Sequence, residues 1–156
     1  MTVANTRTKY DTDIVAWANE QAALMRAGRF DELDIEHISD EVEDVGKSEQ
    51  REFMSHMVVL LSHLLKWKFQ PERRGASWEK TIKAQRLEIA LNIKDSPSLK
   101  SKIADDEWQE VVWAKAIAQA VSETDLDVFP DSNPWSDQQI MDVNFFPDAT
   151  NPPRPV

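Results

Sequence analysis

One histidine and two carboxylates are the first residues in this sequence that could together bind a metal ion. His37, Glu41 and Asp44 are spaced at i, i+4 and i+7, so an α-helix would place them on one face. Helical bundles that bind metals direct such side chains inward, and their signature is a pair of Glu-x-x-His motifs. The sequence contains no such motif. A metal-dependent enzyme is therefore the least favoured of three hypotheses for the function.

The metal hypothesis has a defined set of candidate ligands. They are Glu41, Asp44, Glu49, Glu52, His56 and His63, with Glu41, Asp44 and His63 in first place. The competing interpretation is structural. It leaves His37 solvated among acids and places His56 and His63 on the flank of a helix, hydrogen-bonded to neighbouring residues.

A basic segment between two tryptophans suggests a site for an anion or a nucleic acid. Trp67 and Trp78 flank a turn marked by Pro71, and the surrounding residues are rich in cations. Guanidinium groups bind phosphate in two-pronged geometry and stack on bases, and aromatic rings add stacking surfaces. The candidate residues are Lys66, Lys68, Arg73, Arg74, Lys80, Lys83 and Arg86.

The acidic segment of the chain supplies the alternative explanation for these cations. Residues 31–52 contain ten Asp and Glu against two Lys and Arg. We favour this alternative, in which Trp67 and Trp78 are core anchors and the nearby cations pair with the acids. The cations expected to do so are Arg73, Arg74, Lys80 and Arg86.

Motifs for catalysis are missing from the sequence. The chain has no cysteine, no G-x-S-x-G nucleophile turn, no phosphate-binding loop and no H-E-x-x-H motif. We therefore predict no catalytic residues and no cofactor. The favoured hypothesis is a non-catalytic interaction or regulatory module that binds an unidentified protein partner or a second copy of itself. A net charge of −10 makes nucleic acid a less favoured partner and argues against anionic membranes.

Apolar residues at helical spacing predict helices along most of the chain, and no alternating strand pattern occurs. Asp11 and Ser77 are the expected caps of two of them, and Ser136-x-x-Gln139 has the spacing of a capping box. Helices are expected over residues 11–27, from residue 34, over 48–69, from 77, from 96, over 105–122 and from 136. Residues 35–69 form either two helices that meet near Gly46 or one continuous helix, because glycine inside a helix costs only ~1 kcal/mol.

The predicted fold is all-α, a compact helical bundle around a long central helix, with a loop-rich C-terminal segment. That segment is expected to pack on the bundle through Trp135, Phe145 and Phe146. On the helix that begins at residue 34, one face is apolar and the other acidic; the apolar residues are Ile35, Ile38, Val42 and Val45. Trp113 is out of register with Trp108 and is expected to point outward as a contact residue.

The expected organisation is one helical domain over residues 10–147, between a flexible N-terminus at 1–9 and a disordered proline-rich tail at 148–156. The first residues do not have the pattern of a signal peptide. The longest apolar run, residues 57–65, is far shorter than the ~20 residues that span a bilayer. We therefore expect a cytoplasmic protein that does not bind membranes.

Several sequence blocks together resemble the uncharacterised bacterial family catalogued as domain of unknown function 29. The similarity extends from about Tyr10 to Pro147 and includes His63. The resemblance implies an all-helical, cytosolic bacterial protein and implies no activity. The blocks are Tyr10-x-x-Asp13, Trp17-x-x-x-Gln21, Leu24-x-x-x-Gly28-x-Phe30, Leu33-Asp34, Glu41-Val42-Glu43-Asp44-Val45-Gly46-Lys47-Ser48-Glu49, Leu64-Leu65-Lys66-Trp67, Gln70-Pro71-Glu72-Arg73-Arg74, Ser77-Trp78 and Asp95-Ser96-Pro97-Ser98-Leu99.

Overall fold

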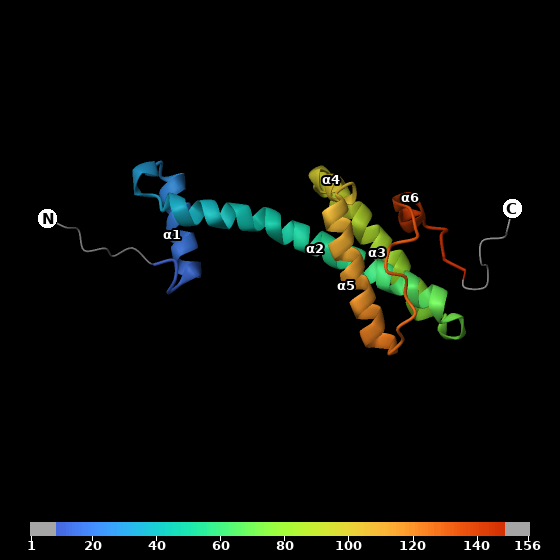
Figure 1. Ribbon diagram of the computed structural model, residues 1–156. Coiled ribbons are helices and arrows are strands. Elements are labelled where there is room, and N and C mark those ends of the chain that lie inside the picture. Colours follow the sequence, from blue (N-terminus) through green and yellow to red (C-terminus); the bar gives the residue numbers. More distant parts are fainter. Residues whose placement is uncertain (1–8, 149–156) are drawn as a thin grey trace. The chain divides into compact units, whose positions relative to one another are not determined.

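The computed structural model describes residues 9–148, and within this range the chain is all-α, as predicted (Figure 1). The predicted flexible N-terminus and proline-rich tail lie outside the described residues, apart from Lys9 and Asp148. The α-helices are α1 (Ile14–Arg26), α2 (Ile35–Phe69), α3 (Ala76–Asp95), α4 (Lys100–Ile103), α5 (Asp106–Thr124) and α6 (Asp137–Met141). Short 3₁₀ helices connect them at η1 (Phe30–Glu32), η2 (Pro71–Arg73) and η3 (Pro97–Leu99).

The chain divides into two compact units, which we call the N-terminal unit (Met1–Ser48) and the C-terminal unit (Glu49–Val156). The helix α2 contributes to both, because it runs through the boundary between them. Within residues 9–148, no helix combines the length and apolar character needed to cross a bilayer.

The helix α2 is continuous over 35 residues, so the prediction of a single helix is correct and the predicted break at Gly46 is absent. The space around Gly46 is open, because no neighbouring atom lies within 4 Å of the position that a Cβ would occupy. No neighbouring segment packs so closely here that it would require a glycine, and the helix accommodates Gly46 at a small cost in stability.

The N-terminal unit is a pair of helices joined by a tight connection. Asp13 caps α1 by accepting a hydrogen bond from the backbone N–H of Ala16 at 3.0 Å, so the predicted cap at Asp11 is wrong by two residues. Gly28 follows the helix with φ of 72°, a left-handed conformation that disfavours any residue with a Cβ. This turn sends the chain through η1 into α2.

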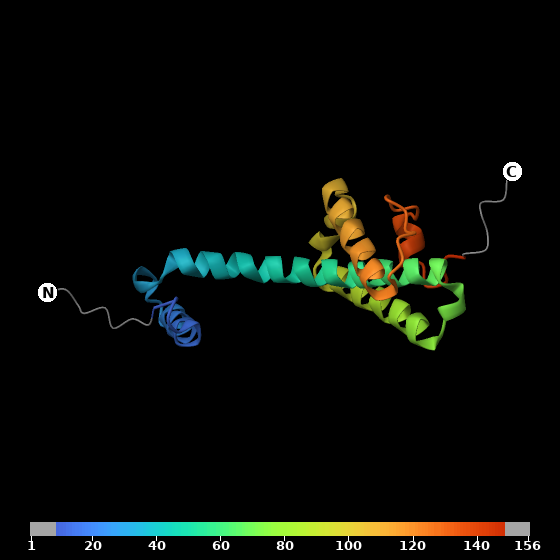
Figure 2. The ribbon, with the colours of Figure 1, turned by 60° about the horizontal axis from the view of Figure 1, so that its bottom comes forward.

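The C-terminal unit contains the main core, which α3 and α5 form with the second half of α2 (Figure 2). Phe53 and Leu64 of α2, Ile82 of α3 and Val112 of α5 are all fully buried. Phe53 also stacks on Trp108 with ring centroids 5.5 Å apart. The predicted cap at Ser77 is wrong, because α3 begins one residue after Gly75 and Gly75 supplies no side-chain cap.

The C-terminal segment packs on this core through aromatic residues, as predicted. Trp135 contacts Trp113 edge-to-face at 5.9 Å and Phe145 at 6.1 Å, while Phe146 lies 5.0 Å from Trp67. The predicted outward orientation of Trp113 is wrong. Its side chain is only 4% exposed, and its Nε1–H donates to the carbonyl of Pro130 at 3.0 Å, because the returning chain covers this face of α5.

Local signals at the last helix are confirmed by the structure. Ser136 accepts from the N–H of Gln139, and the Gln139 side chain accepts from the N–H of Ser136, so the predicted capping box is present. This reciprocal pair holds a helix of only five residues in place.

We expect Gly46→Ala to raise the free energy of unfolding by about 0.5–1 kcal/mol, because alanine loses less backbone freedom in a helix and the space is open. Thermal unfolding followed by circular dichroism measures the change. Gly28→Ala is the matched control and should lower stability, since its φ of 72° is strained for alanine. A lower melting temperature for Gly46→Ala would contradict this account of α2.

Candidate functional site

The basic segment begins with a lysine that is buried and paired. The Lys66 side chain is 5% exposed, donates to the Glu123 carboxylate of α5, and lies 5.3 Å from the ring centre of Trp78. His63 stands next to it, with Nε2 3.5 Å from the Lys66 ammonium. Burial lowers the pKa of His63, and the nearby ammonium lowers it further. A lysine so enclosed is not available to an outside ligand.

Two arginines of the same segment fasten the C-terminal segment. Arg74 donates from Nε to the Trp67 carbonyl at 2.6 Å and from Nη2 to the Pro147 carbonyl at 3.3 Å. Arg86 is 2% exposed and donates from Nε and Nη2 to the carbonyls of Ile140 and Phe145, both at 2.7 Å. The predicted pairing of Arg74 and Arg86 with the acidic segment is therefore wrong, because the carbonyl of Trp67 and carbonyls of the C-terminal segment accept their hydrogen bonds instead.

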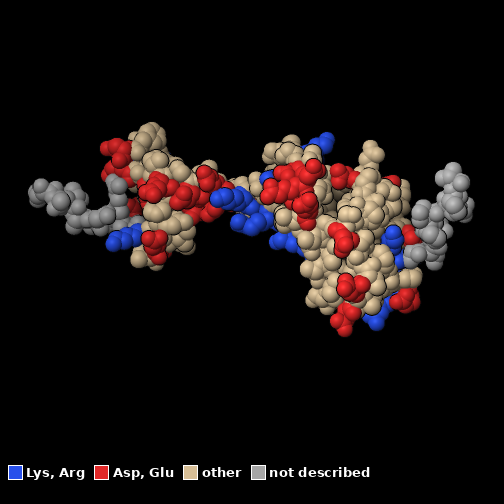
Figure 3. Space-filling model, viewed as in Figure 1, with Lys and Arg blue, Asp and Glu red and all other residues tan. Residues whose placement is uncertain are grey.

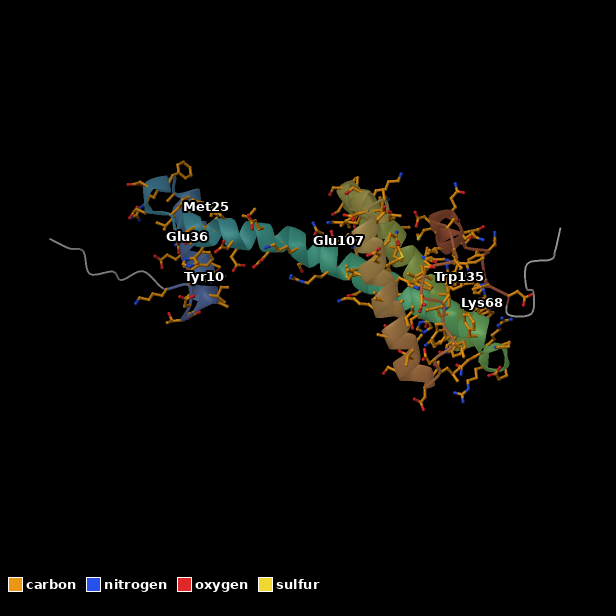
Figure 4. The ribbon with its side chains drawn as sticks, viewed as in Figure 1. Tyr10, Met25, Glu36, Lys68, Glu107 and Trp135 are labelled. Carbon is orange, nitrogen blue, oxygen red and sulfur yellow. The ribbon has the colours of Figure 1, made fainter. Side chains whose placement is uncertain are left out.

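The remaining candidate cations are Lys68, Arg73, Lys80 and Lys83, and the side chain of Lys68 is labelled in Figure 4. Lys83 forms an exposed pair with Glu79 at 2.9 Å, and Lys68 lies 5.6 Å from the ring centre of Phe69. Arg73 and Lys80 are exposed, and neither forms an ion pair within residues 9–148. An anion site on the basic segment stays a prediction for these four cations.

The residues proposed as metal ligands are distributed over both units. Glu41 and Asp44 belong to the N-terminal unit, whereas His63 belongs to the C-terminal unit and bonds through Nδ1 to the Val59 carbonyl at 2.8 Å. His56 contacts the Gln85 side chain at 2.7 Å, as the structural interpretation of these histidines predicted. In the described part of the chain, no group of three or more His, Asp or Glu residues is placed to hold a metal ion.

A polar cluster in the N-terminal unit, centred on Asp34, was missed by the sequence reasoning. Its Oδ2 accepts from Nε1 of Trp17 at 3.0 Å and lies 2.7 Å from Nδ1 of His37. Its backbone N–H donates to Oε1 of Gln21 at 2.8 Å, and its carbonyl accepts from Ile38 in the first turn of α2. Asp34 therefore both starts α2 and ties it to α1.

Tyr10 completes this cluster from the residues before α1 (Figure 4). Its ring stacks on His37 with centroids 4.2 Å apart, and Trp17 meets it edge-on at 4.9 Å. The hydroxyl donates to Glu41. That hydrogen bond and the surrounding carboxylates raise the pKa of Tyr10 to about 12.

The titration of His37 and Asp34 is coupled through their hydrogen bond. The bond to Asp34 raises the pKa of His37, and the same bond lowers the pKa of Asp34. The predicted solvated state of His37 is therefore incomplete, because the side chain is part-buried in an ion pair with Asp34.

An apolar groove of about 410 Å³ lies between α1 and the first turns of α2, and we call it the N-terminal groove. Its lining residues are Trp17, Ala18, Gln21, Ala22, Met25 and Arg26 of α1, and Ile38, Glu41, Val42 and Val45 of α2. Val42 and Val45 are 66% and 67% exposed, although the sequence places them on an apolar stripe. The stripe was visible in the sequence, but spacing alone does not reveal whether the chain itself covers it.

Comparison with known proteins gives a family and no relative of known activity. The model of the family described as Domain of unknown function DUF29 matches residues 9–146. No curated protein matches the chain. No solved structure matches it either.

We expect Arg86→Met to lower the free energy of unfolding by about 2–3 kcal/mol, because it leaves one buried and one part-buried carbonyl without their charged donor. Urea denaturation measures the change. Lys83→Met is the control, since an exposed pair one helical turn apart contributes only about 0.3–0.5 kcal/mol. Equal effects of the two substitutions would argue against the role assigned to Arg86.

We expect the N-terminal unit to be less protected at pH 8 than at pH 6. Because the folded pKa of His37 is raised, its contribution is complete below the ordinary value of 6.5 and is lost as the pH rises through the folded value. The contribution of Asp34, whose pKa is lowered, is lost only at acidic pH. Hydrogen exchange of residues 9–48 measures the protection, after correction for the intrinsic pH dependence of exchange. His37→Gln should remove the difference, and its persistence in that variant would refute the assignment.

Proposed function

The chain belongs to the family described as domain of unknown function DUF29, whose name assigns no activity, and we propose that it acts as a non-catalytic interaction module. Its contact surface is the N-terminal groove. The observation that carries the proposal is that this groove exposes apolar side chains from two helices that are already fixed to each other.

The exposed apolar residues of the groove are typical of a surface that binds another protein. Met25 is 40% exposed and Val42 and Val45 about two-thirds exposed, and all three line one cavity. Single exposed apolar residues are common, but contiguous exposed apolar patches mark sites of protein contact. Burying these side chains against a partner would remove apolar surface from water at roughly 25 cal/mol per Å².

The Asp34 cluster supports the proposal because it shapes the groove before any partner arrives. Trp17 and Gln21 line the groove and are both held by Asp34, through Oδ2 and the backbone N–H. A binding surface held in place in the free protein avoids part of the entropy cost of association.

The C-terminal unit serves in this proposal as a folded scaffold. Its buried cations, Lys66 and Arg86, are engaged by Glu123 and by backbone carbonyls, which leaves less positive charge for an outside ligand. An anion site on the exposed cations of the basic segment has correspondingly less support. The absence of cysteine is compatible with the cytoplasmic location that we propose.

Photo-cross-linking in bacterial cells tests the proposal. With p-benzoylphenylalanine in place of Val42, we expect a discrete cross-linked product, because this side chain lines the groove and is 66% exposed. The matched control is the same replacement of Leu87 on α3, which is 69% exposed and lies outside the groove. Val45→Glu should abolish the product at position 42. Equal products at both positions, or none at position 42, would refute the proposal.

A further inference from the structure

We propose that the occupant of the N-terminal groove is a basic, amphipathic α-helix supplied by another protein. This inference rests on the proposed function and adds the chemistry of the partner. Three properties of the groove carry it: the form of its walls, the charge around it and the effect of that charge on a second copy of the chain.

The walls of the groove have the spacing that receives a helix. Ala18, Ala22 and Met25 lie at i, i+4 and i+7 on α1, while Ile38, Val42 and Val45 lie at the same spacing on α2. Because α1 crosses the start of α2 steeply (Figure 1), a third helix can pack its apolar face along the row of α2, where residues one and two turns apart meet Ile38, Val42 and Val45. Small side chains at Ala18 and Ala22 let its backbone come close, and Met25 adapts to its side chains. The volume of about 410 Å³ falls within the ~300–1,000 Å³ of typical ligand pockets.

The charge around the groove selects a positive partner. Residues 9–48 carry eleven Asp and Glu against four Lys and Arg, a formal charge of −7 with His37 neutral. Figure 3 shows carboxylates gathered on the surface of this part of the chain. Glu41 lines the groove, and Arg26 is the one cation among its ten lining residues. Basic side chains along the edges of a docked helix would meet these carboxylates and speed its association.

The electrostatic potential of these carboxylates also affects the uncharged phenol of Tyr10 in the same unit. The pKa of Tyr10 is raised to about 12, first by its hydrogen bond to Glu41, then by burial, and then by the charges of Glu41, Asp44 and Asp40. The potential that disfavours a phenolate here also disfavours an acidic peptide, and it favours ammonium and guanidinium groups.

A second copy of the chain is the main alternative occupant, and its charge argues against it. A symmetric dimer through this groove would bring the same surface of both chains together. Glu41 and Asp44 of one chain would then approach the same acids of the other, and like charges at an interface cost binding energy. A partner of opposite charge avoids this repulsion.

Three synthetic helices of about 18 residues separate the contributions of shape and charge. The first has Leu at i, i+3, i+4 and i+7 with Lys elsewhere, the second has the same Leu face with Glu elsewhere, and the third keeps Lys but replaces Leu by Ser. Fluorescence anisotropy measures their binding to the full-length protein. We expect the Leu–Lys helix to bind at least about ten-fold more tightly than either other peptide, with a difference that shrinks as salt screens the charges.

Variants of the protein assign the binding to the groove. Val42→Ser with Val45→Ser should weaken the Leu–Lys helix by about ten-fold or more, because it removes the apolar wall. Asp40→Asn with Asp44→Asn should weaken it by about three- to ten-fold and leave the Leu–Glu helix unweakened. Glu88→Gln with Glu110→Gln removes the same charge from exposed positions of the C-terminal unit and is the matched control. Circular dichroism confirms that each variant keeps its helices.

The outcomes distinguish this inference from the proposed function. Equal binding of the Leu–Lys and Leu–Glu helices, lost on Val42→Ser with Val45→Ser, would overturn the basic partner and leave the groove as a contact surface. Absence of binding by every helix, with a cross-linked product at position 42, would overturn the helical partner. Absence of both would refute the proposed function as well. A dimer in sedimentation that Val45→Glu dissociates would replace the basic helix by a second copy.

Discussion

The continuous helix α2 contributes to both compact units, and its two halves pack in different ways. All the buried residues of α2 lie after Glu49, where Phe53, Leu60 and Leu64 enter the main core. Before that point the same helix carries most of its acids and buries none of its side chains. Among residues 9–48 only Trp17 and Leu24 of α1 are buried apolar side chains, so polar contacts add to this small core in holding the N-terminal unit together. Asp34 provides them, because its carboxylate and backbone N–H bind two side chains of α1.

Two arginines of the basic segment show how charged side chains can organise a fold. Arg74 and Arg86 bind backbone carbonyls of the C-terminal segment, which contains little helix of its own and needs donors for those carbonyls. Their guanidinium groups also lie 5.3 Å from the ring of Trp67 and 5.5 Å from that of Phe146. Two of the cations that the sequence suggested for a phosphate site thus bind the chain's own C-terminal segment.

Most features encoded within a few residues could be predicted from the sequence, although the helix caps expected at Asp11 and Ser77 were each two residues away from the observed ones. Of the features made by distant segments, the aromatic packing of the C-terminal segment was predicted, and most others were not. The capping box at Ser136 and the helical stripes depend on neighbours three or four residues apart, so they were predicted correctly. Trp113 was misplaced because the segment that covers it returns from residue 130 and beyond. The Asp34 cluster joins residues up to 31 positions apart, and no short motif indicates it. The groove was missed for a related reason: spacing identifies an apolar face but not what covers it.

Tyr10 can serve as a spectroscopic probe, because it is the only tyrosine of the chain. Its phenol stacks on His37 and donates to Glu41, so its state depends on the folding of the N-terminal unit alone. Loss of those contacts would return its pKa from about 12 toward the ordinary 10.0, and the phenolate absorbs ultraviolet light at wavelengths where the phenol does not. The chain therefore carries its own optical label for one of its two units, readable by alkaline titration without any dye, isotope or engineered residue.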